Sequence, residues 1–402
     1  MSASGRSAVR ARAPALDVAV VGGGMAGAAA ALALARAGFA VALLEARQPP
    51  AWDARDDVDL RVVSLAPSSM ALLSDLGVWT SIREARCSGF GRMQVWDARN
   101  GATLRFDAAA SGRAELGCIV ENRLVQSVLW AALPAADVRV RCPAKVERLH
   151  PGAEQVALEL ADGSQVAARL VVAADGGASP LRQLAGIDTV GRDYAQRAVV
   201  AHVATERPHQ ATAWQRFLPG GPLALLPLAD GRSSIVWSLP AAEAQRVLAL
   251  DDQGFMDALG AASDFRLGRI TATTPRAAFP LRLSLAKSYQ APRMVLLGDA
   301  AHAVHPLAGQ GVNLGLRDVA ELRDCLLAAR QAGRDLGAAH VLRRYARRRR
   351  SADTLDAVGF DTLARVYGWT APPLVAARGM GVHLIERLAP VKRRISRHAA
   401  GI

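Results

Sequence analysis

Residues 16–47, LDVAVVGGGMAGAAAALALARAGFAVALLEAR, decide the fold. The apolar run at residues 16–21 predicts a short buried strand, because such runs bounded by glycine are typical of one. Gly22, Gly24 and Gly27 follow in the spacing G-x-G-x-x-G, and an alanine- and leucine-rich helical pattern begins directly after them. A strand, a glycine-rich turn and a helix in this order predict a site for the phosphates of a dinucleotide.

Each part of this motif has a physical reason. Gly22 permits the tight turn from strand to helix, Gly24 leaves room for a pyrophosphate against the backbone, and Gly27 lets helix and strand pack closely. Glu45 ends a second strand predicted at residues 39–44, about 20 residues on, where a ribose-binding acid is expected. The motif alone does not separate NAD from FAD. The contacts predicted in this stretch are Gly22, Gly24, Met25, Ala26, Gly27, Glu45 and Arg47.

The motif occurs once after a predicted strand. The glycines at 309–315 have a different spacing. An enzyme that holds FAD and NAD in two separate Rossmann folds would show two such motifs. The sequence therefore predicts one tightly held dinucleotide, and any second one must bind without a Rossmann half of its own.

Composition narrows the class of protein. The chain has 402 residues, of which 51% are hydrophobic, so a large core is expected and disorder is not. No apolar run approaches the ~20 residues of a membrane span. Residues 1–15 are basic and small and lack the apolar segment of a secretory signal, so we expect a frayed terminus in a cytoplasmic protein, with a transit peptide as the alternative.

The net charge of +13 could favour binding of a nucleic acid, an anionic membrane surface or an anionic cofactor. Its densest cluster, RRYARRRR at residues 343–350, has no interleaved aromatics for base stacking, so nucleic acid is not predicted and a solvated helix face is favoured over a lipid contact. The cysteines are scattered and form no C-x-x-C pair, so we expect reduced core thiols rather than zinc ligands or disulfides. They are Cys87, Cys118, Cys142 and Cys325.

Two further corners follow apolar strands. Residues 170–174 end at Asp175 and Gly176, and Ser179 with Pro180 are typical of a helix start. A second strand ends at Gly298 and Asp299. Side chains at the carboxyl ends of strands are where open α/β sheets bind ligands. We therefore expect Asp175 and Asp299 to approach the same cofactor.

Two arginines could either contact a ligand or lie in solvent. Arg123 lies in the first turn of an amphipathic helix predicted near residues 120–133. Arg61 closes the charge run at residues 53–61, which is most simply a solvated loop, and is the one residue singled out there. Spacing alone leaves both positions open.

Hairpin signals occur between these segments. Asn100-Gly101 and Asp230-Gly231 each interrupt strand-like sequence, which predicts antiparallel pairing. The fold class expected is α/β, a Rossmann-type domain with an inserted antiparallel-sheet substrate domain and a C-terminal helical segment. The predicted boundaries are 14–88, 112–190 and 290–352 for the dinucleotide-binding domain, 89–111 and 191–289 for the substrate domain, and 353–402 for the C-terminal helices.

The run GDAAHAVHPLAGQGVNLGLRD, residues 298–318, mixes histidines with glycines. His302 and His305 could share one helix face, but no carboxylate or third histidine is apparent beside them, so no metal is predicted. His302 is expected to be packed or hydrogen-bonded behind the loop, and His305 with Pro306 to line the substrate side. The glycines would admit an anion or a flat polar ring, and the helix starting near Val312 would point its positive end at that ligand.

These residues together carry a family resemblance. The first glycine motif with Glu45, then Ala174-Asp175-Gly176, then the run at 298–318 stand in the order of single-component flavin-dependent aromatic hydroxylases, which the chain resembles from about residue 17 to 401. Three segments are similar to the ubiquinone-biosynthesis branch of that family: HPLAGQGVNLGLRD, LGCIVENRLVQSVLWAAL and LAPVKRRISRHAAGI. The segment IVENRLVQ leans towards the enzyme that hydroxylates the demethoxy intermediate. HAAG departs from the branch, which often has methionine before the glycine.

The resemblance implies FAD and a role for each site residue. Glu45 should hold the adenosine ribose, Asp299 the ribityl chain or pyrophosphate, and Asp175 belongs to a second FAD motif. The remaining implied cofactor contacts are Arg61 and Arg123 near the phosphates or flavin edge, and Gly298, Gly309, Gln310, Gly311, Val312 and Asn313 along the loop beside the isoalloxazine. His305, Pro306 and Gln310 are the flavin-facing candidates for catalysis, and no general base is identified.

The implied reaction is hydroxylation of an aromatic ring with O2 and NAD(P)H through a flavin hydroperoxide, on a polyprenyl phenol or quinone precursor of ubiquinone. Such a substrate resides in a membrane, and residues 371–398 mix apolar and basic residues as an interfacial helix does, although a packed terminal helix fits equally. We therefore expect a cytoplasmic protein with peripheral contact to the inner membrane face or to a ubiquinone-synthesis complex. The alternatives are an oxidase, dehydrogenase or prenyl reductase of the same fold, a hydroxylase of a small soluble aromatic, and a flavin-bearing scaffold.

Overall fold

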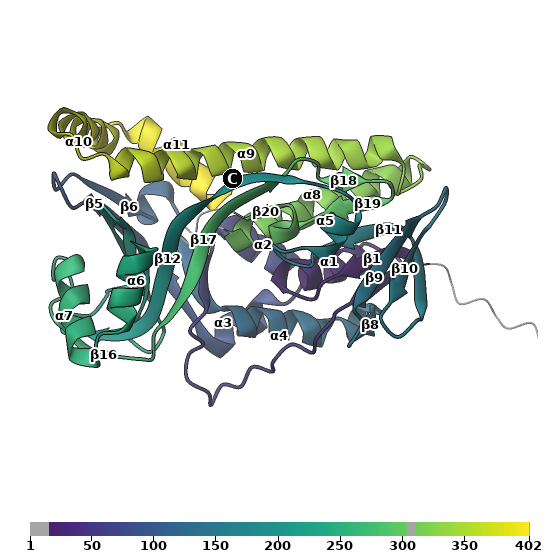
Figure 1. Ribbon diagram of the computed structural model, residues 1–402, viewed down its shortest axis with the longest axis horizontal. Coiled ribbons are helices and arrows are strands. Elements are labelled where there is room, and N and C mark those ends of the chain that lie inside the picture. The colour runs from purple at the N-terminus through teal and green to yellow at the C-terminus, as the bar shows by residue number, and fades with distance from the viewer. Residues whose placement is uncertain (1–15, 304–310, 402) are drawn as a thin grey trace, which may run out of the picture.

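The computed structural model describes residues 16–303 and 311–401. A Rossmann-type sheet and a second, mainly antiparallel sheet lie at opposite ends of the molecule, with helices packed between and over them (Figure 1). The first sheet has the order β18-β19-β11-β1-β2-β8, with β9 and β10 attached to β11. Its strands are β1 Leu16–Val21, β2 Val41–Leu44, β8 Arg139–Arg141, β9 Val146–Pro151, β10 Val156–Leu160, β11 Gln165–Ala173, β18 Gln290–Ala291 and β19 Met294–Leu296.

The four central pairings, β1 with β2 and β11, β2 with β8 and β11 with β19, are parallel. Parallel strands end at the same edge, so Gly22, Glu45, Ala174 and Leu297 leave the sheet side by side. Helix α1 (Met25–Arg36) returns across one face, and its residues from Gly27 to Leu34 are all buried. The predicted strand at 16–21 is confirmed, and the second strand begins at Val41 rather than residue 39.

Three helices complete the core beside α1. Helices α4 (Asn122–Ala132) and α8 (Gly311–Gln331) pack on α1, and α9 (Ala339–Gly368) packs on α8. Together they enclose one apolar cluster with β1, β2 and β11. The remaining short helices of this part are α2 Pro67–Asp75, α3 Trp79–Arg86, α5 Pro180–Leu184, and the 3-10 turns η1 Ala109–Ser111, η2 Pro134–Ala136 and η3 Gly298–Ala300.

The second sheet has the order β20-β17-β12-β15-β14-β13-β5-β6, with β16 paired to β12. Both predicted hairpins are confirmed, since β5 pairs antiparallel with β6 across Asn100-Gly101 and β14 with β15 across Asp230-Gly231. Helices α6 (Ala241–Leu248) and α7 (Asp252–Ala262) cover its outer face. The strands are β5 Arg92–Asp97, β6 Thr103–Asp107, β12 Thr189–Thr205, β13 Thr212–Leu218, β14 Gly221–Pro227, β15 Ser233–Pro240, β16 Ile270–Thr273, β17 Ala277–Ala286 and β20 His302–Ala303.

A small third sheet, β3-β7-β4, joins the two halves and corrects one prediction. It consists of β3 Val62–Leu65, β7 Gly117–Glu121 and β4 Cys87–Phe90. Cys87 and Cys118 stand on neighbouring antiparallel strands with Cα atoms 6.3 Å apart and are disulfide-bonded. The expectation of four reduced thiols is therefore wrong for this pair, because strand pairing joins cysteines that the sequence separates. Cys142 and Cys325 are free thiols.

Helix α10 (Pro372–Arg387) lies against β6 of the second sheet beside the end of α9, and α11 (Ala389–Ala400) packs on α10 and pairs with α9 through His398 and Asp356 (Figure 1). Arg378 of α10 is buried, and its Nε donates to Asp97 of β5 at 2.6 Å. Its guanidinium also donates to the carbonyl of Val366 and lies over the Tyr367 ring. Within the described residues, none of the helices combines the length and apolar character needed to cross a bilayer.

Candidate functional site: a dinucleotide cradle

The glycine turn after β1 leaves an open space at one position only. A Cβ on Gly22 would lie 2.3 Å from the carbonyl oxygen of Ala174, and one on Gly27 would lie 1.9 Å from that of Gly22. Gly24 is exposed, and a Cβ there would meet nothing within 4 Å. The first and third glycines therefore serve close packing, whereas Gly24 borders a space at the amino end of α1, where helix N–H groups attract phosphate.

Side chains from two other elements hold this turn in place. The Glu45 carboxylate accepts a hydrogen bond from the N–H of Gly23 through one oxygen and from the N–H of Arg47 through the other. From α4, Gln126 Nε2 and Trp130 Nε1 both donate to the Gly23 carbonyl at 2.7 Å. Glu45 is thus part of the cradle itself, and each carboxylate oxygen keeps a second lone pair that a ribose hydroxyl can use.

Helix α1, the turn η3 and helix α8 meet beside Gly24. A Cβ on Gly298 or on Gly315 would each lie 3.2 Å from the Ala26 Cβ, so both glycines allow the close approach. Gly298 adopts a left-handed φ of +61°, which favours glycine. The predicted convergence of the 298–318 run on the first glycine motif is therefore present in the structure. Gly311, which begins the described part of α8, borders open space.

Asp299 projects from η3 at this junction. Its side chain is exposed, and no described residue donates a hydrogen bond to it. Protein atoms nevertheless surround it on most sides, and this desolvation raises the pKa of its carboxyl, while the charges of His302 and Arg61 oppose the rise. An accessible, unpaired acid in a concave setting is available for a ligand hydroxyl.

The Asp175 carboxylate is already hydrogen-bonded within the protein. Its carboxylate accepts from Ser179 Oγ at 2.5 Å and from the N–H of Leu181 at 2.9 Å, and it therefore caps the start of α5. Burial raises the pKa of this carboxyl, although these hydrogen bonds oppose the rise. Arg182 donates to the carbonyls of Ala300 and Gly177, which ties the Asp175 corner to the Asp299 corner.

The charge run at 53–61 is more than a solvated loop. We call residues 52–61 the strap. Arg123 of α4 pairs with Asp56 at 3.0 Å and with Asp59 at 3.5 Å. Arg61 is exposed, and its guanidinium lies 5.5 Å from the centre of the Phe279 ring on the second sheet. The strap thus brings Arg61 and Arg123, both predicted cofactor contacts, to the same side of the molecule.

A buried pair anchors the strap on the small sheet. Glu121 accepts from Trp52 Nε1 at 3.2 Å and from the N–H of Asp59 at 2.8 Å, and it pairs with Arg86 at 3.5 Å. Arg86 in turn donates to the carbonyls of Ala54 and Asp56. Sequence reasoning missed Arg86 and Glu121, because neither belongs to a motif and their partners lie far along the chain.

The second sheet holds the other side of the strap. Arg232 pairs with Asp57, and this contact lowers the pKa of the Asp57 carboxyl. The ring of buried His202 in β12 lies with Nε2 at 3.0 Å from the carbonyl oxygen of Asp59, so Nε2 carries the proton and donates. The strap therefore bridges both halves of the molecule.

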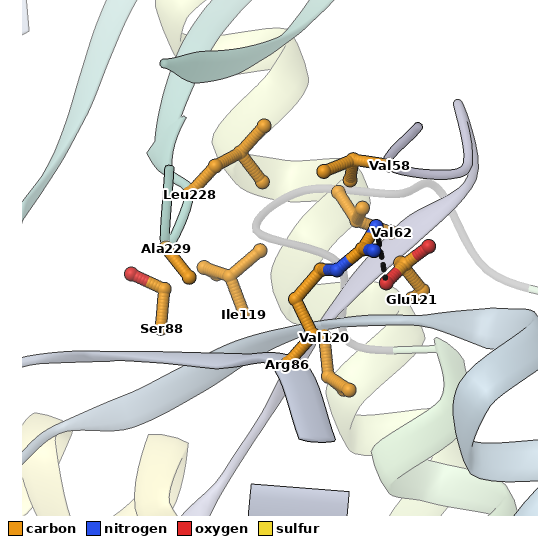
Figure 2. Close-up of a pocket in the computed structure, with 9 residues that line it drawn as sticks. All are labelled: Val58, Val62, Arg86, Ser88, Ile119, Val120, Glu121, Leu228 and Ala229. Atoms are coloured by element: carbon orange, nitrogen blue, oxygen red, sulfur yellow. Dashed lines mark ion pairs between the residues drawn. The ribbon is translucent and has the colours of Figure 1, made fainter. Parts of the chain in front are cut away.

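A small cavity lies where the strap meets the two sheets (Figure 2). Figure 2 shows the Arg86–Glu121 pair at one side, with mainly apolar side chains around the rest. Its volume of about 10 Å³ is room for about one water, so it is not a substrate site. Its lining is Val58, Val62, Arg86, Ser88, Ile119, Val120, Glu121, Leu228 and Ala229.

The loop candidates fall into two groups. Asn313 is fully buried; its Oδ1 accepts from the N–H of Ala66 and the hydroxyl of Ser69, and its Nδ2 donates to the carbonyl of Ser64. Its side chain thus fastens α8 to the segment between β3 and α2, while Val312 packs against the core. His305, Pro306, Gly309 and Gln310 lie outside the described residues.

His302 has carboxylate neighbours that sequence reasoning did not find. Its Nε2 lies 2.7 Å from Asp318 Oδ2 and 3.5 Å from Asp353 Oδ2, and all three side chains are fully buried. Arg349 pairs with both carboxylates. The statement that no carboxylate lies near the histidines is therefore wrong for His302, because α8 and α9 bring these acids back behind η3. The expectation that His302 is hydrogen-bonded behind the loop is confirmed.

These four groups predict a pH dependence of stability. Burial disfavours the imidazolium, but the Asp318 carboxylate outweighs it and raises the pKa of His302 to about 9, while burial raises the pKa of Asp353 to about 7. Arg349, Tyr289 and Tyr345 are the other groups facing this centre. Both folded pKa values exceed the unfolded ones, so each group contributes stability that is lost as the pH rises. The contribution of Asp353 is gone once the pH has passed about 7, and that of His302 is lost between about pH 6.5 and 9.

We expect the free energy of unfolding to fall on the order of 2 kcal/mol from pH 6.5 to 9 because of His302. Urea titrations of the protein at several pH values measure this slope. His302→Gln, which keeps a donor near Asp318 but cannot ionise, should flatten it. An equally steep slope in that variant would exclude His302 as its source.

Comparison with known proteins agrees with this geometry. The family model described as "FAD binding domain" matches residues 15–355. The 3-demethoxyubiquinol 3-hydroxylase of Escherichia coli is 38% identical over 96% of this chain and 98% of its own length. The human mitochondrial ubiquinone biosynthesis monooxygenase COQ6 is 36% identical over 96% of this chain and 92% of its own.

Solved structures show the same fold. PqsL of Pseudomonas aeruginosa, described as a probable FAD-dependent monooxygenase, superposes with a TM-score of 0.76 at 24% identity and covers 92% of this chain and 99% of its own. HpxO of Klebsiella pneumoniae, solved with FAD, gives 0.72 at 21% identity over 93% and 97%. The fold, the cradle and these matches define an FAD-dependent aromatic-ring monooxygenase.

The sequence identities of 36–38% over nearly the whole chain define a narrower group within this class. This chain belongs to the ubiquinone-biosynthesis hydroxylases of that family. The residues described fit FAD on structural grounds: the space at Gly24 admits a phosphate, Asp299 is unpaired, and the Gly311 backbone leaves room for a flat ring.

Proposed function

We propose that this protein hydroxylates the aromatic ring of a polyprenylated ubiquinone precursor, with O2 and NAD(P)H as co-substrates. The observation that carries the proposal is the close approach of Gly298 and Gly315 to Ala26, which brings the Gly24 turn, Asp299 and the start of α8 to one place. The relatives named as ubiquinone hydroxylases support the class of substrate.

The cofactor contacts follow from the cradle. The pyrophosphate would lie against Gly24 and the amino end of α1, and the adenosine ribose would take the free lone pairs of Glu45. Asp299 would accept from a ribityl hydroxyl. When bound, FAD would carry reducing equivalents from NAD(P)H and activate O2, which no side chain can do.

The protein's own part is to hold the strap and exclude water. Arg61 and Arg123 bring positive charge near the phosphates or flavin edge, and the pairs of Arg123 with Asp56 and Asp59 keep the strap closed. Phe279, 39% exposed although it lies in β17, presents an apolar surface beside Arg61. An apolar ring and tail fit against such a wall, and exclusion of water there suppresses release of peroxide.

Isotope labelling tests the proposed reaction. Purified protein loaded with FAD is supplied with NAD(P)H, an electron-rich prenylated phenol and 18O2. The mass of the product is then measured by mass spectrometry. One 18O atom per new hydroxyl is expected. Oxidised product without 18O would show an oxidase or dehydrogenase instead. Flavin that is not reduced by NAD(P)H, with no product in a complemented deficient strain, would support a scaffold.

We further propose that the C-terminal helices contact an anionic membrane surface. Apolar side chains spaced three or four residues apart stay exposed along α10 and α11, with Met380 at 68% and Leu384 at 57%. Exposed Arg393, Arg394 and Arg397 follow on α11. An apolar stripe flanked by arginines matches the interface of anionic lipids. The stripe is Met380, Leu384, Leu388, Val391 and Ile395.

Vesicle sedimentation measures this contact. We expect binding to vesicles that contain phosphatidylglycerol, weaker binding at high salt, and at least about a tenfold loss of partitioning for Met380→Glu with Leu384→Glu. Leu184→Glu, which changes an exposed leucine on α5, is the matched control. Equal binding of the double variant and the control variant would contradict the proposal.

A further inference from the structure

Four buried ionisable side chains lie directly behind the Gly298–Asp299 turn. His302 follows η3, Asp318 comes from α8, and Arg349 and Asp353 come from α9. All four are at least nine-tenths buried. We call them the quartet. Such groups are expensive to remove from water, and apolar residues of similar size are often at least as stable in their place. Their presence at this position therefore calls for a reason other than stability.

Asp318 connects the quartet to the turn. Its Oδ2 accepts from the N–H of Gly298 at 2.8 Å and lies 2.7 Å from His302 Nε2, and its Oδ1 accepts from Arg349 Nε. The turn after β19 therefore has one backbone N–H fixed by a charged group that two other elements, β20 and α9, hold in place. Asp299, the next residue, is accessible.

Arg349 and His302 place two cations beside the two carboxylates, so the quartet is close to neutral and is not a metal site. The Arg349 guanidinium already bridges Asp318 and Asp353, so a divalent ion would have to displace or oppose a cation. Asp353 Oδ2 has no hydrogen-bond partner among the described residues, and His302 Nε2 is 3.5 Å away. Asp353 is therefore the less completely paired of the two acids.

We propose that the quartet positions the Gly298–Asp299 turn and sets the affinity of the site for reduced relative to oxidised FAD. Asp318 acts through Gly298, and the charges of His302, Arg349 and Asp353 act through space on the ring beside α8. This inference rests on the proposed placement of FAD at Asp299. Reduced flavin carries more negative charge than oxidised flavin, so each charge added or removed behind the turn changes the relative affinity for the two forms.

Two substitutions separate electrostatics from packing because they change the charge in opposite directions. At pH 8, where Asp353 with its pKa of about 7 is mostly ionised and His302 with its pKa of about 9 is mostly protonated, Asp353→Asn removes a negative charge and His302→Gln removes a positive one. Asp353→Asn does not touch Gly298, and His302→Gln keeps a donor near Asp318. We expect the ratio of affinities for reduced and oxidised FAD to rise about threefold to tenfold in Asp353→Asn and to fall by a similar factor in His302→Gln.

Spectroelectrochemical titration gives the midpoint potential of bound FAD, and fluorescence quenching gives the affinity for oxidised FAD. Asp356→Asn is the matched control, because Asp356 lies on the same helix but pairs with Arg317 and His398. Its potential should stay at the wild-type value. A shift of both quartet variants in the same direction, or no shift in either, would overturn the proposal.

The same titrations distinguish this failure from failure of the proposed FAD placement. Wild-type protein that binds FAD but shows no opposite shifts rejects only the quartet's role. Wild-type protein that binds no FAD rejects the placement itself. Asp318→Asn adds an independent readout, because loss of its charge should weaken FAD binding at least about tenfold while the strap contacts remain.

Discussion

Gly24→Val will give a folded, colourless protein. Gly24 has φ −67° and ψ −179°, which a valine tolerates, and a Cβ there meets no protein atom within 4 Å. The side chain would fill only the space in which we place the pyrophosphate. We expect thermal stability of the apoprotein close to wild type and at least a hundredfold loss of FAD affinity, which corresponds to about 3 kcal/mol.

Two further glycine variants make this result specific. Gly27→Val should fail to fold, because its Cβ would lie 1.9 Å from the carbonyl oxygen of Gly22. Gly359→Val on α9, another glycine with open space at Cβ, should bind FAD as wild type does. Absorbance of bound flavin, fluorescence titration and thermal melting read out all three. A yellow Gly24→Val protein with unchanged affinity would show that the phosphates lie elsewhere.

Arg378→Met will destabilise the fold by about 3–5 kcal/mol. Arg378 and Asp97 are 2.6 Å apart with side chains 2% and 1% exposed, so loss of the arginine leaves a buried, uncompensated carboxylate. The variant also loses the hydrogen bond to the Val366 carbonyl and the contact with the Tyr367 ring. These contacts join α10 to the second sheet and to the end of α9.

A double-mutant cycle isolates the pair. Asp97→Asn with Arg378→Met should recover part of the loss, because asparagine keeps an acceptor for the N–H of Arg99 and carries no charge. Lys392→Met, which removes the half-exposed pair of Lys392 with Glu386, should cost less than about 1 kcal/mol. Urea unfolding measures wild type, the single variants Arg378→Met and Asp97→Asn, the double variant and Lys392→Met. A cost for Arg378→Met no larger than that for Lys392→Met would mean that α10 does not dock as described.

The parts of the molecule that sequence predicts are those governed by local chemistry. The first strand, the glycine turn, the Asn100-Gly101 hairpin and the Ser179 cap each follow from residues a few positions apart. The convergence of Gly24 with Gly298 could also be expected, because parallel strands end at one edge and the motifs follow those ends.

The parts that escaped prediction join residues distant in sequence through charge or strand pairing. Asp318 lies 16 residues from His302, and only the return of α8 brings them to 2.7 Å. Glu121 and Arg86 carry no motif, yet they hold the strap. Cys87 and Cys118 meet only because β4 pairs with β7. Asp318 was the one residue with a signal, since it closes the same run that contains His302.

The central claim is that one FAD lies where the glycine turn, Asp299 and the start of α8 meet. A crystal structure of the FAD complex tests it most directly. We predict the pyrophosphate against Gly24, a ribityl or phosphate oxygen within hydrogen-bond distance of Asp299, and the ring beside Gly311. Electron density for FAD at another place, or a flavin whose phosphates do not contact the Gly24 turn, would contradict this account.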